Sequence, residues 1–116
     1  MYYERHPILW TIHSAFPGAD FWLISRHSQE MLGKPVQEYQ KGCFGLLAPQ
    51  CYYPKYAFYL CDYLWSNQFW DAYAYGCLNL QHLRITDVRE FFRPGSYIIS
   101  PEGKLIVLTP PQLATA

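Results

Sequence analysis

The sequence lacks a surplus of charge of either sign. Nine Lys and Arg residues balance nine Asp and Glu residues, so the formal net charge at pH 7 is zero. Proteins that bind nucleic acid independently usually carry a positive field, because phosphate contacts supply much of the affinity. The balanced charge therefore argues against tight, independent DNA binding, although it leaves room for a local basic patch.

Long hydrophobic runs are also missing. No apolar stretch reaches the roughly 20 residues that a membrane-spanning helix needs. The first residues, MYYERHPILW, lack the cationic start and apolar core that are typical of a secretory signal peptide. We therefore expect a cytoplasmic protein that has no membrane partner.

The cysteines and histidines show no metal-binding spacing. No two cysteines form a C-x-x-C pair, no paired histidines follow at zinc-finger spacing, and no glycine-rich phosphate loop is present. Disulfides are rare in the cytosol, so free thiols are expected. We expect neither a metal nor a cofactor. The four cysteines are Cys43, Cys51, Cys61 and Cys77.

Apolar and aromatic residues dominate what is present. Hydrophobic residues make up 51 % of the 116 residues and charged residues only 16 %, which is typical of a folded chain and not of a disordered one. This length predicts a single domain, residues 1–116. Aromatic residues reach 19 %, led by 11 Tyr, and tyrosine is enriched where proteins meet their partners.

Residues 54 to about 75 carry the clearest helix pattern. Pro54 suits the first helical position, and Gly76 suits a C-terminal cap. One apolar face has the spacing i, i+3, i+4 and i+7. A tyrosine stripe lies beside it, so we expect the helix to pack on two sides, with residues 66–68 as a point of interruption. The apolar face is Ala57, Leu60, Cys61 and Leu64, and the stripe is Tyr52, Tyr56, Tyr59 and Tyr63.

Short β-type segments surround this helix. Residues 8–12 alternate as in a strand, FWLISR follows a Pro-Gly turn, and VQEYQKGCFGLLAP predicts one or two strands. Within the last segment, Gly42 and Gly45 indicate a bulge or a close approach of the backbone.

The C-terminal third predicts a short helix and a hairpin. Thr86 can cap a helix over about 86–92, with Asp87 in its first turn. SYIISPEGKLIVL then predicts a hairpin over 96–109 with a turn at 100–103. The element order favours an α+β fold, in which a mixed or antiparallel sheet packs on one main helix, about 54–75.

Two polar segments contain the candidate functional residues. They are SRHSQE at 25–30 and NLQHLR at 79–84. Arginine, asparagine and glutamine are the side chains that make paired hydrogen bonds to base edges, but they occur equally in ordinary solvated loops. Tyr73 and Tyr75 lie nearby and can stack on bases or on a protein partner.

Catalysis is not expected. A nucleophilic site needs Cys or Ser beside a base, and no spacing in this sequence selects such a pair. Cys61 falls on the apolar helix face, where a thiol is inert. We therefore predict no catalytic residue and no enzyme.

Several segments taken together resemble the target recognition domain of type I restriction-modification specificity subunits. FWLISR with the following GKP resembles that family's strand and glycine loop, and KGCFGLLAP resembles its next strand pair. YPKYAFYLCDYL resembles its aromatic helix, and YGCLNLQHLRITDVREFFRP resembles its turn, polar loop and short helix. The resemblance covers about residues 20–94.

The resemblance implies a non-enzymatic module that recognises part of a double-stranded DNA target beside methyltransferase or nuclease subunits. Members of that family usually carry two such domains joined by long spacer helices, whereas this chain has one and no heptad-like segment. The DNA contacts that it implies are Arg26, His27, Gln29, Lys34, Asn79, Gln81, His82 and Arg84.

An alternative class remains open. The tyrosine excess and the zero net charge also fit a small protein-interaction or homo-oligomeric domain with no role in nucleic-acid binding. The partner-interface candidates are then Tyr56, Tyr59, Tyr63 and Trp70.

Overall fold

A computed structural model of the protein describes residues 4–77 and 79–111. Its largest sheet is four-stranded, antiparallel and ordered β1-β5-β2-β4. One face of this sheet carries the apolar residues that meet the helices. The strands are β1 (Thr11–His13), β2 (Phe21–Ile24), β4 (Pro35–Val36) and β5 (Cys43–Leu47).

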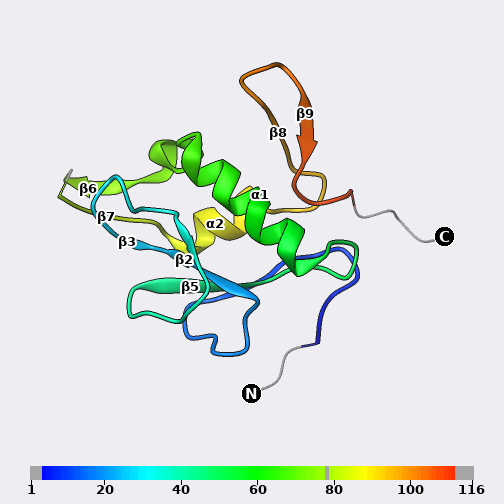
Figure 1. The fold of residues 1–116 in the computed structure, drawn as a ribbon, viewed down its shortest axis with the longest axis horizontal. Coiled ribbons are helices and arrows are strands. Elements are labelled where there is room, and N and C mark those ends of the chain that lie inside the picture. The colour runs from blue at the N-terminus through cyan, green and yellow to red at the C-terminus, as the bar shows by residue number, and fades with distance from the viewer. Residues whose placement is uncertain (1–3, 78, 112–116) are drawn as a thin grey trace.

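Two smaller antiparallel sheets complete the strand pairing. The second sheet has the order β3-β7-β6, and the third is the hairpin β8-β9, which projects from the body of the molecule (Figure 1). These strands are β3 (Arg26–His27), β6 (Tyr75–Cys77), β7 (Leu80–His82), β8 (Tyr97–Ile99) and β9 (Leu105–Val107). Together with the helices, they confirm the predicted α+β fold and the predicted C-terminal hairpin.

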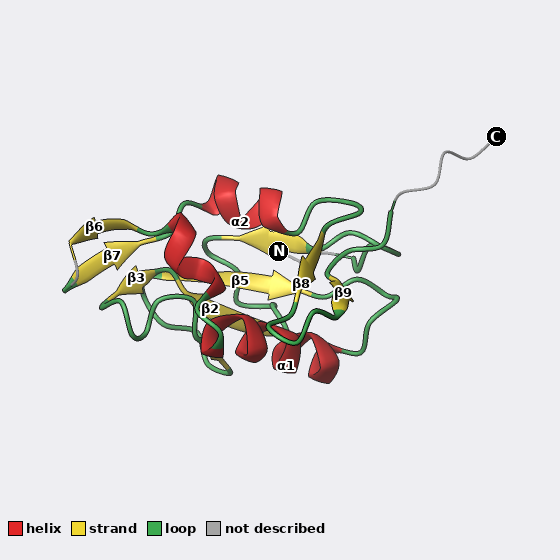
Figure 2. Cartoon of the chain, turned by 90° about the horizontal axis from the view of Figure 1, so that it is seen from above, coloured by secondary structure: helices red, strands yellow, loops and turns green. Residues whose placement is uncertain are grey.

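The helices cover the large sheet from one side. They are α1 (Pro54–Ser66), the 3-10 helix η1 (Phe69–Tyr73) and α2 (Ile85–Phe91). Seen from above, β2 and β5 lie between the paths of α1 and α2 (Figure 2). The main core joins apolar side chains from the sheet, both α-helices and η1. The predicted apolar face of α1 is confirmed, since its buried residues are Ala57, Leu60, Cys61 and Leu64.

The main helix is shorter than the predicted 54–75. It ends at Ser66, because Asn67 caps it and Gln68 takes a left-handed conformation (φ 61°) that turns the chain. The amide Nδ2 of Asn67 donates to the Tyr63 carbonyl at 2.9 Å, and this bond satisfies one carbonyl of the last turn. Residues 66–68 are thus the interruption that their polarity indicates, and η1 follows as a separate element.

Gly76 does not cap a helix. It lies in β6 with φ 105°, and a Cβ at this position would stand 2.6 Å from the Leu80 carbonyl oxygen. The glycine is therefore needed for close pairing of β6 with β7 and not for ending the main helix.

The second helix begins one residue before the predicted range. Arg84, not Thr86, is the N-cap residue, because its backbone is extended (φ −93°, ψ 136°) and its carbonyl accepts from the Asp87 and Val88 amides. Asp87 lies in the first turn, as predicted. The first strand also differs from its predicted range, 8–12. It begins later in the chain, since β1 covers Thr11–His13.

The tyrosine stripe of α1 is packed only in part, since Tyr52 and Tyr63 are partly buried against the main core. Tyr56 and Tyr59 are 45 % and 58 % exposed, and Tyr53, just before the helix, is 83 % exposed. The prediction of packing on two sides therefore holds for only half of the stripe, because tyrosine's hydroxyl lets the other two rings stay in water. Among the described residues, no helix has the length and apolar character needed to cross a membrane.

Candidate nucleic-acid interface

The sheet β3-β7-β6 joins the two polar segments that the sequence separates. Arg26 pairs with His82, and His82 pairs on its other side with Tyr75. The first segment was expected to leave a strand and the second to form a loop, and each contributes a strand of this sheet. Partners directly across an antiparallel pair share one face of the sheet. The register therefore brings Arg26, His82 and Tyr75 to the same face.

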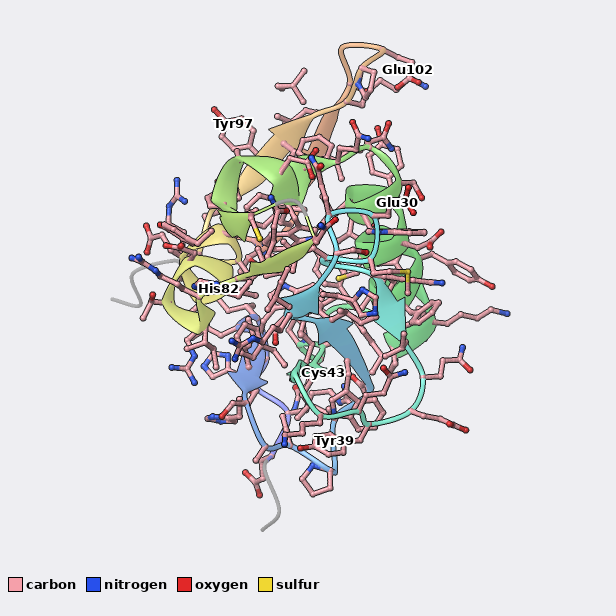
Figure 3. The ribbon with its side chains drawn as sticks, turned by 90° about the vertical axis from the view of Figure 1, so that its left-hand side faces the viewer. Glu30, Tyr39, Cys43, His82, Tyr97 and Glu102 are labelled. Carbon is pink, nitrogen blue, oxygen red and sulfur yellow. The ribbon has the colours of Figure 1, made fainter. Side chains whose placement is uncertain are left out.

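Arg84 completes this face. Its Cζ lies 3.8 Å from the centroid of the Tyr75 ring, a cation–π contact, and the Tyr75 and His82 rings stack with centroids 5.7 Å apart. Arg26, Tyr75, His82 and Arg84 are all exposed. We call these four residues the basic-aromatic face. Figure 3 looks onto this end of the molecule, with His82 at one side and Glu30 at the other.

A third cation adjoins the basic-aromatic face. The Gly42 carbonyl accepts from the Ser25 amide at 2.9 Å, and a Cβ on Gly42 would lie 3.6 Å from the Cβ of Arg26. Lys41 is exposed and precedes Gly42, so its backbone lies near Arg26. Arg26, Arg84 and Lys41 thus supply three exposed cationic residues in this region, although the net charge of the chain is zero.

Other predicted DNA contacts lie away from this face. His27 follows Arg26 and lies across from Gln81, so it belongs to the opposite side of the sheet. Lys34 stands over the Trp65 ring, with its Nζ 5.3 Å from the centroid. Asn79 is exposed in the turn that joins β6 and β7, and Gln29 is exposed in the loop after β3.

The prediction that Gln81 contacts DNA is corrected by its burial. This glutamine is only 9 % exposed, and its Oε1 is buried without a hydrogen-bond partner among the described residues. It sits in the central strand of the small sheet with its side chain on the face opposite to His82, because successive residues of a strand alternate. Gln81 is therefore not placed to contact a macromolecule.

The predicted partner-interface residues fall into a buried group and an accessible group. Trp70 is 1 % exposed and packs at 4.7 Å from the Phe91 ring, so it belongs to the core and cannot anchor a partner. Tyr63 is partly buried with a buried hydroxyl. Tyr56 and Tyr59 remain accessible. The prediction missed Trp70's burial because η1 begins a new helical phase after the break at Gln68.

A second accessible apolar surface was not foreseen. One face of the hairpin exposes four side chains that the register places together, Tyr97 opposite Val107 and Ile99 opposite Leu105. Their exposed fractions range from 40 % to 61 %. No clear sequence signal indicates it, because YII and LIV are apolar at every position, and only the structure shows that Ile98 is buried while its neighbours are exposed.

Metal-ligating side chains are not gathered at one place in the part of the chain that the structure describes. No cluster of three or more His, Cys, Asp or Glu side chains there is arranged to hold a metal ion. Burial raises the pKa of the Cys61 thiol, and burial also raises the pKa of the Cys43 thiol. What the basic-aromatic face offers is hydrogen bonding from two guanidinium groups and stacking from two rings.

The fold and this face define a small α+β protein with a basic and aromatic surface on a three-stranded sheet. The family of unknown function DUF6943 matches residues 11–106, and the chain belongs to this family. The matched range contains every residue of the basic-aromatic face. No curated protein and no solved structure matches the chain.

Proposed function

We propose that this protein is a non-enzymatic recognition module that binds double-stranded DNA through the basic-aromatic face and acts with partner subunits. The observation that carries the proposal is the register of β3, β7 and β6, which sets Arg26, His82 and Tyr75 side by side with Arg84 stacked on Tyr75. The resemblance to target recognition domains points to the same two segments.

The chemistry of the face suits DNA. Guanidinium groups bind phosphates and make paired hydrogen bonds to guanine in the major groove. Tyr75 orients Arg84 through the cation–π contact, so this guanidinium loses less freedom on binding. With Lys41 the face holds three cations, which is few for a DNA-binding protein. Weak binding of this kind fits a module that works beside a methyltransferase or nuclease subunit.

Salt dependence and two matched variants test the proposal. With three phosphate contacts, the logarithm of the binding constant should fall against log salt with a slope of about −3. Arg26→Ala and Arg84→Ala should each weaken binding to random duplex DNA and make the slope shallower by about 1. The measurement is fluorescence anisotropy at several salt concentrations, with melting temperatures taken in parallel.

Lys104→Ala is the control, because Lys104 is exposed in the hairpin turn, far from the small sheet (Figure 1). It should leave both affinity and slope unchanged. Unaltered affinity in both arginine variants would remove the proposal. Tighter binding to single-stranded than to duplex DNA would contradict the duplex target, since stacking of free bases would then dominate.

A second candidate function is self-association through the hairpin. The exposed row of Tyr97, Ile99, Leu105 and Val107 lies on a two-stranded sheet, and a chain of zero net charge has no long-range repulsion against its own copy. A twofold contact would lay the same row of each copy against the other. The partner in this second candidate function is therefore another copy of the same chain.

A further inference from the structure

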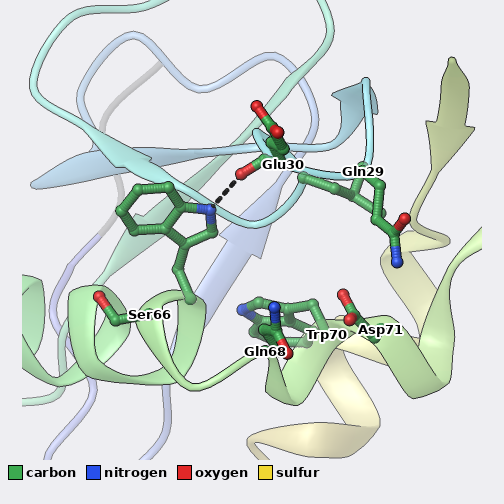
Figure 4. A pocket seen from close by; sticks show the side chains of 8 residues that line it. Gln29, Glu30, Ser66, Gln68, Trp70 and Asp71 are labelled. Carbon is green, nitrogen blue, oxygen red and sulfur yellow. Dashed lines mark hydrogen bonds between the residues drawn. The ribbon is translucent and has the colours of Figure 1, made fainter. Parts of the chain in front are cut away.

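A cavity of about 500 Å³ lies where the end of α1, η1 and the loop after β3 meet. This volume falls in the range of small-molecule sites. Figure 4 shows two indole rings, two carboxamides and one carboxylate around it, together with Glu30, whose own carboxylate points away from the other lining side chains. These side chains belong to Trp65, Trp70, Gln29, Gln68, Glu30 and Asp71.

One donor in the lining lacks a partner. Trp70 is 1 % exposed, and its Nε1 is buried without an acceptor among the described residues. In Figure 4 the indole nitrogen is at the end of the ring nearer to Trp65. The ring is held in place, because a Cβ on Gly33 would stand 2.2 Å from Cδ1 of Trp70. An unpaired buried donor is costly, and a ligand acceptor would relieve that cost once a small movement of the cavity wall uncovers the nitrogen, which is covered in this structure.

Gln68 is a second unusual feature of this wall. Among the described residues, Gln68 alone has a positive φ (61°) without being a glycine. Residues with such backbone strain are often found at ligand sites. Gln29 faces the cavity from the opposite loop (Figure 4). A carboxamide both donates and accepts, so the two glutamines can bind a ligand that does the same.

The charges around the cavity select a class of ligand. Glu30 and Asp71 line it, and none of the described lining residues is basic, so an anion is disfavoured. A cation is also a poor fit. The ammonium of Lys34 already lies 5.3 Å from the Trp65 centroid, and a cation has no acceptor for the Trp70 donor.

A sugar ring fits each of these groups. Its hydroxyls donate to carboxylates and also accept from amides and from an indole N–H. The Trp65 indole is partly exposed and lines the cavity, but Lys34 already lies over its ring, so the hydrogen bonds carry the binding. We propose that this cavity is a binding site for a neutral sugar. The proposal does not depend on DNA binding at the basic-aromatic face.

The four indole N–H signals of the full chain, labelled with ¹⁵N, provide the test. The Trp65 and Trp70 signals should shift saturably with at least one of glucose, galactose and N-acetylglucosamine, with a millimolar Kd. The Trp10 and Trp22 signals should stay in place, since neither residue lines this cavity and their N–H groups donate to the Leu108 and Phe16 carbonyls, each at 3.0 Å. They are built-in controls. The Trp65 N–H donates to the Glu30 carbonyl at 2.8 Å, so its signal reports a ligand close to the ring and not a new hydrogen bond.

Variants and competing ligands make the result decisive. Asp71→Asn should weaken sugar binding at least about fivefold, because a charged acceptor is replaced by a neutral one. Asp62→Asn, on α1 outside the cavity lining, should leave the affinity unchanged. The sugar assignment is overturned if glucose, galactose and N-acetylglucosamine all fail to produce a saturable shift. It is overturned equally if adenosine, glucose 6-phosphate or spermidine binds more tightly than all three of these sugars.

Discussion

At the scale of single residues, burial separates the four cysteines into two pairs. Cys43 and Cys61 are buried, whereas Cys51 and Cys77 are exposed. Burial disfavours the thiolate, so the pKa of Cys61 lies above its ordinary value of 9.0, and the pKa of Cys43 is raised for the same reason. Because the thiolate is the reactive form, the two pairs should differ in reactivity as well as in accessibility.

We predict that a thiol reagent modifies two cysteines quickly in the native protein and the other two only on unfolding. Cys51→Ala and Cys77→Ala should each remove one equivalent of the fast phase, measured by absorbance with a chromogenic disulfide. Cys61→Ala should leave the fast phase intact. A fast phase of more than two equivalents at neutral pH would contradict the burial of Cys43 and Cys61.

The raised pKa of Cys61 also predicts a pH dependence. Above pH 9 the unfolded thiol ionises while the folded thiol stays protonated, so the unfolded state releases the proton first. The free energy of unfolding should therefore fall as pH rises above 9, by at most about 1.4 kcal/mol per pH unit for this thiol. The contribution of this thiol to the free energy of unfolding keeps its full value below pH 9. Urea titrations at several pH values should show a shallower fall for Cys61→Ala than for Cys51→Ala.

At the scale of elements, two glycines with nearly the same positive φ angle have different surroundings. Gly33 in the loop before β4 has φ 83°, and Gly103 in the hairpin turn has φ 84°. A Cβ on Gly33 would meet the Trp70 ring, whereas a Cβ on Gly103 would meet nothing within 4 Å. The pair therefore separates the cost of a left-handed backbone from the cost of a steric clash.

Gly103→Ala should lower the free energy of unfolding by about 1–2 kcal/mol, the cost of the backbone alone. Gly33→Ala should cost about 1–3 kcal/mol more, because the Trp70 ring or the loop must move. Equilibrium unfolding in urea measures both. Equal losses in the two variants would mean that Gly33 does not pack on Trp70 as described.

The break after α1 shows why an element boundary can escape a sequence pattern. Residues 66–68 are polar, but polar residues also occur inside helices, so they mark a possible end and not a certain one. The left-handed turn at Gln68 lets Trp70 enter the core beside Phe91 and Phe92. Burial of this large ring is a tertiary gain that the local pattern does not report.

At the scale of the whole molecule, the accessible apolar surface is concentrated on the hairpin and along α1. If the hairpin binds a second copy, light scattering should show a dimer that forms as the concentration rises. Leu105→Asn should then favour the monomer, since Leu105 is 61 % exposed and sits in the exposed row. Tyr59→Ser on α1 should leave the dimer intact.

The opposite result for these two variants would assign self-association to the tyrosines of α1, as their sequence pattern suggested. A monomer at every concentration would remove self-association altogether. Both substituted side chains are largely exposed, so neither variant should unfold the chain.

The sequence by itself determined the features that depend on neighbouring residues. The buried face of α1 follows from the spacing of Ala57, Leu60 and Leu64, and the hairpin turn follows from Pro101 and Gly103. These patterns act over a few residues, so local chemistry is enough to specify them. The α+β class follows from the order of such elements.

Only the tertiary structure decided which distant segments meet. The strands β3 and β7 contain two and three residues, too few for an alternation pattern to show, and their pairing brings Arg26 beside His82 across more than fifty residues of chain. Contacts at this separation form because burying Trp70, Leu83 and Phe92 in one core lowers the free energy of the whole fold. The basic-aromatic face and the cavity beside Trp70 therefore exist only in the folded protein.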